Sequence, residues 1–160
     1  MGGGMLAFFN AELRSGADLL LELSQFESKI GNADLIITGE GRIDRQSLMG
    51  KIPGKILEIG KQKEIPVIVI AGCVEDEEIL QAAGFKGIFA TKPQNMTLEE
   101  AMKKETAKRN IERVLRIVIQ SGIKWSEESQ QSLCVIEILH YVQNDTHKEL
   151  ASAHLEALIR

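Results

Sequence analysis

Residues 33–51 have the sequence ADLIITGEGRIDRQSLMGK, and this stretch decides the fold prediction. It opens with a short apolar run at 33–38, centred on Ile36 and followed directly by Gly39. A compact, β-branched run between turn-forming residues is typical of a buried parallel strand. We therefore predict a strand at 33–38, followed by a glycine-rich loop.

Two further runs have the same character, at 66–71 (PVIVIA) and at 87–90 (GIFA). Apolar residues at helical spacing lie around these strands, and Thr97 with Glu100 forms a capping-box pattern that opens a long helix. The helices are predicted at 5–13, 17–30, 54–63, 75–83 and from Thr97 to Gly122. Alternating strands and helices predict an α/β fold: a partial parallel sheet of about three strands with flanking helices.

The end of the chain differs in composition from the rest. All three histidines, together with Trp125 and Tyr141, follow Gly122. Apolar residues in this segment again have helical spacing. We predict one α/β unit at residues 1–120, followed by a helical tail at residues 121–160.

The bulk composition excludes several classes of protein. The 160 residues are 44% hydrophobic and 26% charged, with a net charge of -4, which is typical of a soluble domain and not of a nucleic-acid binder. No apolar run approaches the roughly 20 residues of a membrane span, and no basic segment of a signal peptide is present. Cys73 and Cys134 match no metal or redox spacing, which indicates reduced thiols. We predict a cytoplasmic protein without a membrane or nucleic-acid partner.

The predicted loop after the first strand combines carboxylates with cations. Glu40 and Asp44 could hold Mg²⁺ or position a hydroxyl, and Arg42 and Lys51 could neutralise phosphate charge. Ligands of open α/β sheets bind outside the carboxyl ends of the strands, where this loop is expected. The mixture predicts phosphoryl transfer, with Glu40, Asp44 and Lys51 as candidate catalytic residues. The sequence leaves open which carboxylate acts as the base.

Small residues in the same stretch are candidates for contact with substrate or phosphate. Glycine lets a backbone approach a ligand closely, and its N–H can face an anion. The candidate substrate- and phosphate-binding residues are Thr38, Gly39, Gly41, Arg42, Ser47 and Gly50. The spacing from Gly41 to Lys51 does not fit a Walker A motif. A purely structural alternative also exists, in which Asp44 caps the following helix.

A resemblance to a known family is carried by a long central run: 33–44 (ADLIITGEGRID), 46–48 (QSL), 50–51 (GK) and Pro53. This run resembles the signature of the bacterial glycerate kinase family, and the resemblance continues from Gly3 to about Ile117. It implies ATP-dependent phosphorylation of D-glycerate with Mg²⁺. It also implies a two-domain α/β protein whose active site lies between the domains.

The resemblance covers only part of a family member. Family members are much longer, and their amino-terminal D-S-F-K-G-like motif has no counterpart here. We therefore expect a truncated form, for which two functions stay open. One is a kinase-like protein, and the other is a non-catalytic α/β remnant that binds a small anion or a complementing chain. A sheet that lacks neighbouring strands would also favour a homo-oligomer.

Overall fold

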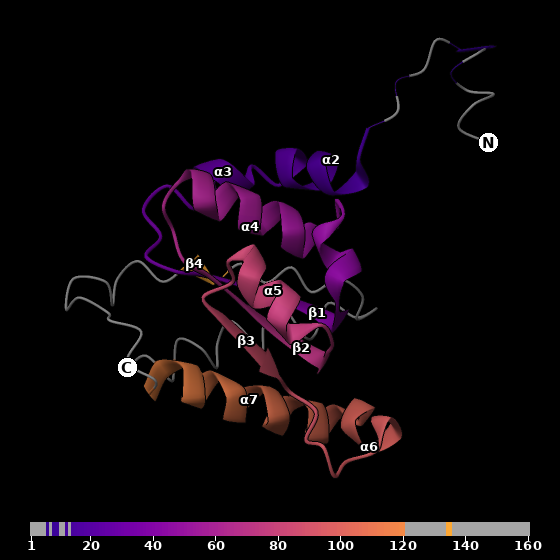
Figure 1. Cartoon of the computed structure of the whole chain (residues 1–160), viewed down its shortest axis with the longest axis vertical. Coiled ribbons are helices and arrows are strands. Elements are labelled where there is room, and N and C mark those ends of the chain that lie inside the picture. Colours follow the sequence, from indigo (N-terminus) through magenta and orange to yellow (C-terminus); the bar gives the residue numbers. More distant parts are fainter. Residues whose placement is uncertain (1–5, 7, 10–11, 13, 121–133, 136–160) are drawn as a thin grey trace.

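The computed structural model describes residues 6, 8, 9, 12, 14–120 and 134–135. Figure 1 shows a central sheet with helices on both faces. The elements in chain order are α2 (Gly16–Leu23), α3 (Phe26–Lys29), β1 (Ile36–Ile43), the 3-10 helix η1 (Arg45–Leu48), α4 (Ile52–Gln62), β2 (Val67–Val74), α5 (Glu77–Ala83), β3 (Gly87–Ala90), α6 (Leu98–Met102), α7 (Lys104–Gln120) and β4 (Cys134–Val135).

The sheet is parallel throughout, with strand order β3-β2-β1-β4. The predicted α/β class is therefore confirmed, and the three predicted strands are β1, β2 and β3. The short strand β4 pairs with Ile36 and Ile37 of β1 and was not predicted. It lies in the segment predicted to be a helical tail, the rest of which falls outside the described residues.

Two apolar clusters cover the two faces of the sheet. The larger contains Leu21 of α2, Phe26 of α3, Ile56 of α4 and Leu80 of α5, packed against one face of β1 and β2. The smaller places Val114 and Val118 of α7 against the other face. Figure 1 shows this three-layer arrangement, with α2 to α5 on one side of the strands and α7 on the other. Burial on both faces explains why the strand sequences are apolar runs rather than alternating patterns.

The predicted end of the first strand is wrong. Strand β1 continues through the predicted loop to Ile43, and β2 likewise continues past Gly72 to Val74. The pairing keeps one register throughout, from Ile36 opposite Val67 to Ile43 opposite Val74. Glycine is unfavourable in a strand but does not end one when the backbone pairing continues.

Two predicted helices are each divided in the structure. The helix predicted at 17–30 is divided into α2 and α3 at Gln25, whose φ of 52° is left-handed. The helix predicted from Thr97 is divided into α6 and α7 at Lys103, whose φ and ψ of -62° and 129° are extended. The apolar spacing continues across both breaks, so periodicity alone does not reveal them.

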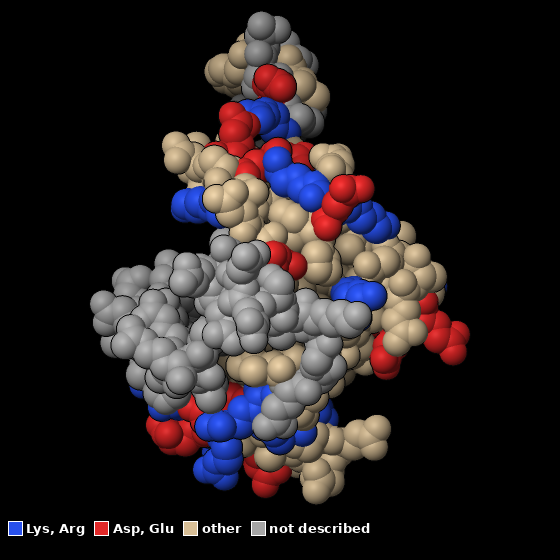
Figure 2. All heavy atoms as spheres, turned by 90° about the vertical axis from the view of Figure 1, so that its left-hand side faces the viewer, with Lys and Arg blue, Asp and Glu red and all other residues tan. Residues whose placement is uncertain are grey.

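The surface carries charges of both signs. On the face shown in Figure 2, blue and red side chains lie interspersed over the described atoms. Among the described residues, no helix combines the length and the apolar character that crossing a bilayer requires.

Candidate functional site

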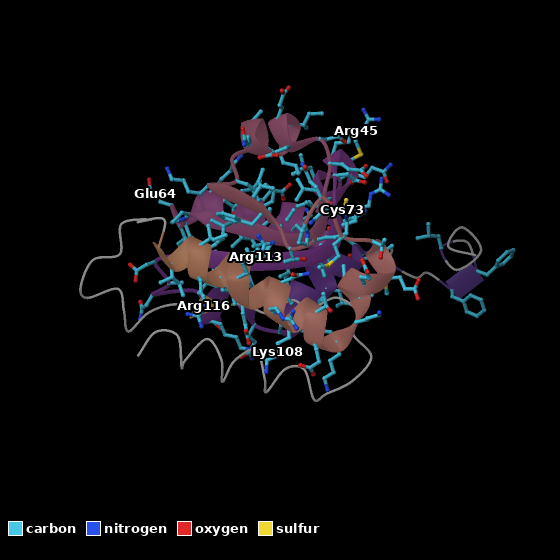
Figure 3. All side chains as sticks on the ribbon, turned by 90° about the horizontal axis from the view of Figure 1, so that it is seen from below. Arg45, Glu64, Cys73, Lys108, Arg113 and Arg116 are labelled. Carbon is cyan, nitrogen blue, oxygen red and sulfur yellow. The ribbon has the colours of Figure 1, made fainter. Side chains whose placement is uncertain are left out.

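The predicted site residues gather at the carboxyl edge of the sheet. This edge contains the end of β1, helix η1, the first turn of α4 and the segment that follows β2. Figure 3 shows Arg45 and Cys73 at this edge and Glu64, which precedes β2, at the opposite one. Ligands of parallel α/β sheets bind at the carboxyl edge.

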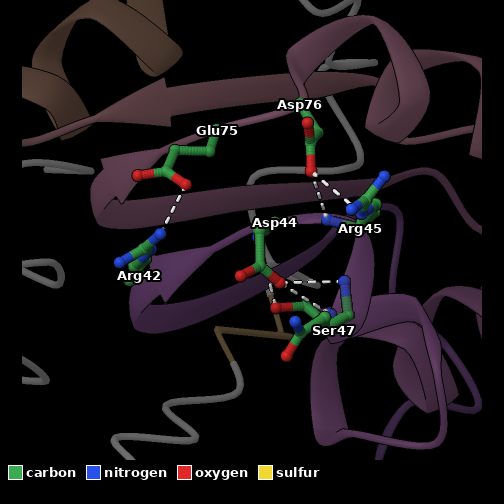
Figure 4. A network of polar contacts seen from close by, with 7 residues as sticks. Arg42, Asp44, Arg45, Ser47, Glu75 and Asp76 are labelled. Carbon is green, nitrogen blue, oxygen red and sulfur yellow. Dashed lines mark hydrogen bonds and ion pairs between the residues drawn. The ribbon is translucent and has the colours of Figure 1, made fainter.

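Asp44 begins helix η1 and is its cap. Its backbone is extended, and its Oδ1 accepts hydrogen bonds from the backbone N–H of Gln46 at 2.8 Å and of Ser47 at 3.2 Å. The Ser47 hydroxyl accepts a bond of 3.4 Å from the backbone N–H of Asp44, which completes a reciprocal capping box (Figure 4). The structural alternative for Asp44 is therefore present, whatever chemical role it also has.

The two predicted carboxylates meet at Ser47. Besides its contacts with Asp44, Ser47 donates its hydroxyl proton to Glu40 Oε2 at 3.0 Å. Ser47 is completely buried, whereas Glu40 and Asp44 are half-buried. One small buried residue thus fixes the direction of both acids.

Helix α4 packs closely against η1 and Ser47. A Cβ atom at Gly54, in its first turn, would lie 2.7 Å from the Ser47 carbonyl oxygen and 2.9 Å from Leu48 Cα, so only glycine fits there. Gly50 has φ of 77°, a left-handed conformation that suits glycine, and it turns the chain from η1 into α4.

Lys51 is the N-cap residue of α4. Its side chain is exposed and makes no hydrogen bond or ion pair within the described part of the chain. The structure therefore brings Lys51 to the same edge as the carboxylates without joining it to them. An ammonium group in this position can meet an anion at the edge of the sheet.

Arg42, predicted to face phosphate, is paired with an acid. Its guanidinium donates to Glu75 Oε2 at 2.5 Å, and Arg45 approaches Asp76 Oδ2 through its backbone N–H at 3.3 Å and its Nε at 3.9 Å (Figure 4). The hydrogen bond to Glu75 and its negative charge raise the pKa of Arg42, which is charged at any physiological pH. Both pairs are exposed and tie the end of β1 to the segment after β2.

The glycines and the acids of the motif do not all share a face of β1. Ile36 packs in the cluster with α4 and Ile37 in the cluster with α7. Because side chains alternate along a strand, Thr38 and Glu40 lie on the α4 side and Gly39 on the α7 side. In a loop, as predicted, all these groups could contact one ligand. In a strand they lie on opposite faces.

The alternation shifts at Gly41. Ile43 returns to the cluster on the α4 side, and Gly41 lies where β1 passes Gly72 of β2. A Cβ at Gly72 would lie 2.5 Å from the Gly41 carbonyl oxygen, whereas a Cβ at Gly41 would meet no atom of the described residues within 4 Å. Close backbone approach therefore accounts for Gly72, and Gly41 faces open space.

Thr38 is buried, and its Oγ1 has no hydrogen-bond partner among the described residues. A buried hydroxyl without a partner is uncommon, because losing its hydration costs free energy. Thr38 precedes Glu40 by two residues, so its buried hydroxyl lies on the same side of β1 as the Glu40 carboxylate.

Sequence reasoning missed three residues at this edge: Glu75, Asp76 and Lys92. Glu75 and Asp76 follow the end of β2 directly, where the sequence predicted only the start of a helix at 75–83. Lys92 follows β3; its backbone N–H bonds the Gly72 oxygen at 3.3 Å, and its Nζ bonds the carbonyls of Pro93 and Met96 at 3.4 and 3.2 Å. The position after each strand was the available signal for all three.

Within the described ranges, no group of three or more His, Cys, Asp or Glu side chains could hold a metal ion. Mg²⁺ commonly takes only one or two protein carboxylates together with substrate phosphates and water. Glu40 and Asp44 therefore fit Mg²⁺ in ligand type and number, although Asp44 Oδ1 already accepts two backbone N–H groups.

Comparison with known proteins identifies the family. The family model described as the glycerate kinase family matches residues 1–121. The chain belongs to the glycerate kinase family. This confirms the resemblance carried by the run at 33–51.

Several members of the glycerate kinase family are similar to this chain. The glycerate kinase of Halalkalibacterium halodurans is 39% identical over 117 residues, which are 69% of this chain and 31% of that protein. The glycerate 2-kinase of Escherichia coli is 38% identical over 104 residues, 64% of this chain and 27% of that protein. A solved structure of a proposed glycerate kinase 2 from Salmonella typhimurium LT2 has 36% identity and a TM-score of 0.50, covering 75% of this chain and 32% of that one. The chain spans about a third of the length of these relatives.

Proposed function

We propose that this chain is glycerate kinase-like and serves ATP-dependent phosphoryl transfer to D-glycerate. The observation that carries the proposal is the pair of carboxylates, Glu40 and Asp44, directed by one buried serine at the carboxyl edge of the sheet. Family membership supports the choice of reaction and of substrate.

In this proposal the carboxylates act on the attacking hydroxyl of glycerate. One of them, Glu40 or Asp44, accepts the hydroxyl proton as the oxygen attacks the terminal phosphorus of ATP, and the bond from that phosphorus to the ADP oxygen breaks. Positioning and charge stabilisation are the main contributions to catalysis of phosphoryl transfer. Two carboxylates held at one buried junction offer the required fixed geometry.

The cations and small residues serve the phosphates. Of the two predicted cations, Lys51 makes no ion pair with the described residues, and Arg42 can exchange Glu75 for a phosphate oxygen. Gly39, Gly41 and Gly50 allow close approach to the backbone. Thr38 and Ser47, both buried, belong to the proposed site as its inner support.

Mg²⁺ fits this arrangement as a second component. The carboxylate that does not accept the proton, Glu40 or Asp44, would hold it together with oxygens of the nucleotide. When bound, it neutralises charge on the phosphates. The proton transfer and the direction of the two carboxylates depend on the protein residues alone.

The experiment is a coupled assay of ADP release by the full chain with ATP, Mg²⁺ and D-glycerate. If Asp44 is the base, Asp44→Asn should abolish glycerate-dependent release, because asparagine can keep the helix cap but cannot accept the proton; if Glu40 is the base, Glu40→Gln should do so instead. Asp34→Asn is the matched control, since Asp34 is exposed before β1 at the opposite edge and its replacement should leave the rate unchanged. Near-normal release by Asp44→Asn would remove Asp44 from the mechanism.

A second candidate is a non-catalytic α/β module that binds a small anion or a partner chain. Its non-catalytic character is favoured by two ion pairs, because Glu75 and Asp76 already neutralise Arg42 and Arg45. Calorimetric titration of the full chain with ADP and with inorganic phosphate separates the candidates. Binding without any glycerate-dependent ADP release would favour the second candidate, and turnover would exclude it.

A further inference from the structure

We propose that Ser47 is a positioning residue, which holds the Glu40 carboxylate in the direction that phosphoryl transfer requires. The inference rests on the proposed function and names the residue that orients one of its two carboxylates. It differs from the expectation for Ser47 drawn from the sequence, which was direct contact with phosphate.

The Ser47 hydroxyl both donates and accepts a hydrogen bond inside the protein. A serine hydroxyl has one proton to donate and lone pairs to accept with. The proton goes to Glu40 Oε2 at 3.0 Å, and the oxygen accepts from the Asp44 backbone N–H at 3.4 Å. Because Ser47 has no exposed surface, a ligand at the edge of the sheet meets Glu40 rather than this hydroxyl.

Ser47 is itself held rigidly. Its backbone N–H is bonded to the Asp44 carboxylate, and its carbonyl oxygen lies against the site where Gly54 lacks a Cβ. A bond from a mobile surface serine would not restrict a glutamate. A bond from a residue fixed by helix packing and by its own backbone does restrict it.

Glu40 needs such a partner more than Asp44 does. Asp44 is short and is fixed by two backbone N–H groups. Glu40 has one more rotatable bond, and Ser47 is the only hydrogen-bond partner of its carboxylate among the described residues. A glutamate that loses this bond gains rotamers, and misplacement of a catalytic group by about 1 Å can cost on the order of 100-fold in rate.

The test is a double-mutant cycle in the full chain, with Ser47→Ala, Glu40→Gln and the double variant assayed for ADP release. If Ser47 acts through Glu40, Ser47→Ala lowers kcat about 10- to 100-fold with little change in KM. The same replacement should then have little further effect in the Glu40→Gln background. Ser28→Ala is the matched control, since the exposed Ser28 hydroxyl bonds the Gln25 carbonyl three residues earlier and is not connected to Glu40.

A second readout does not depend on turnover. The ¹³C signal of the Glu40 side-chain carboxyl should move in Ser47→Ala and keep its position in Ser28→Ala, with thermal unfolding used to verify that both variants are folded. Should Ser47→Ala prove unfolded, Ser47→Cys keeps the volume and provides only a weak donor, so the same measurements apply to it.

The outcomes separate this inference from the proposed function. A wild-type chain that releases no ADP contradicts the proposed function, and the carboxyl signal then decides whether Ser47 holds Glu40. Turnover combined with equal effects of Ser47→Ala in both backgrounds leaves the function standing and overturns the positioning role. An unmoved Glu40 signal in a folded Ser47 variant overturns it as well.

Discussion

Two short helices in this chain begin with the same reciprocal pattern of hydrogen bonds but in different surroundings. At η1, Asp44 and Ser47 cap each other, and at α6, Thr97 and Glu100 do so with bonds of 3.0 to 3.2 Å. Thr97 and Glu100 are both exposed, whereas Ser47 is buried and also bonds Glu40. The two caps share this reciprocal pattern, and they differ in residue types, in helix type and in burial.

The comparison shows that a helix cap can also connect its helix to neighbouring elements. The cap of α6 satisfies backbone groups of its own helix. The cap of η1 does the same, and in addition it connects β1 to η1 and packs against α4 through Gly54. Replacements in the η1 region should therefore affect both stability and the proposed chemistry, and replacements at α6 should affect stability alone.

The largest expected effect comes from Gly54→Ala. The added Cβ would lie within 3 Å of two backbone atoms of η1, which cannot move as a flexible side chain could. We expect a loss of about 1–3 kcal/mol in the free energy of unfolding, measured by urea denaturation. Gly16→Ala is the matched control, because a Cβ at Gly16 in the first turn of α2 meets no atom within 4 Å. Equal stability of the two variants would show that η1 does not depend on this packing.

The next effect separates the cap of η1 from the charge of Asp44. Asp44→Ala removes the acceptor of two backbone N–H groups and should cost about 1–2 kcal/mol, while Asp44→Asn keeps a good N-cap and should cost clearly less. Urea denaturation of both variants measures the difference. If both lose the same stability, the negative charge rather than the hydrogen bonds accounts for the effect.

Thr97→Ala applies the same change to the exposed cap. We expect a loss of about 0.5–1 kcal/mol, near the lower end for N-cap replacements, because water can solvate the released Glu100 N–H. The variant should keep the catalytic behaviour of the wild-type chain, since Thr97 follows β3, which β2 separates from β1 in the sheet. A loss as large as that in Asp44→Ala would mean that burial does not distinguish the two caps.

The two caps also show what sequence reasoning could and could not find. Thr97 and Glu100 match a known local signature and were predicted. The cap at η1 is aspartate with serine three residues later, and it was foreseen only as a possible helix cap at Asp44. The bond from Ser47 to Glu40 joins residues seven apart on different elements, and no local pattern predicts it.

The sheet shows the same limit. Apolar runs predicted β1, β2 and β3 because burial on both faces dictates composition. The continuation of β1 through Gly39 to Ile43 depends on pairing with β2, which is a tertiary fact. For that reason the sequence predicted which residues lie at the carboxyl edge but not that Glu40 and Gly39 point to opposite faces of one strand.

The smallest expected effect is the pH dependence of the exposed cap. The backbone N–H of Thr97, and then its hydroxyl, hold the pKa of Glu100 below its ordinary value. Folding therefore favours the charged carboxylate, and this stabilisation is fully present above the ordinary glutamate pKa of about 4.3 and is lost as pH falls through the lower folded-state value. Glu100→Gln keeps an N3 side chain able to bond the Thr97 N–H but cannot be ionised. In urea denaturation from pH 7 to pH 3, the advantage of wild type over Glu100→Gln should stay constant down to about pH 5 and shrink below it. An advantage that persists unchanged at pH 3 would show that the Glu100 charge does not contribute to the cap. The hydrogen bonds alone would then account for the stability that the caps of η1 and α6 provide.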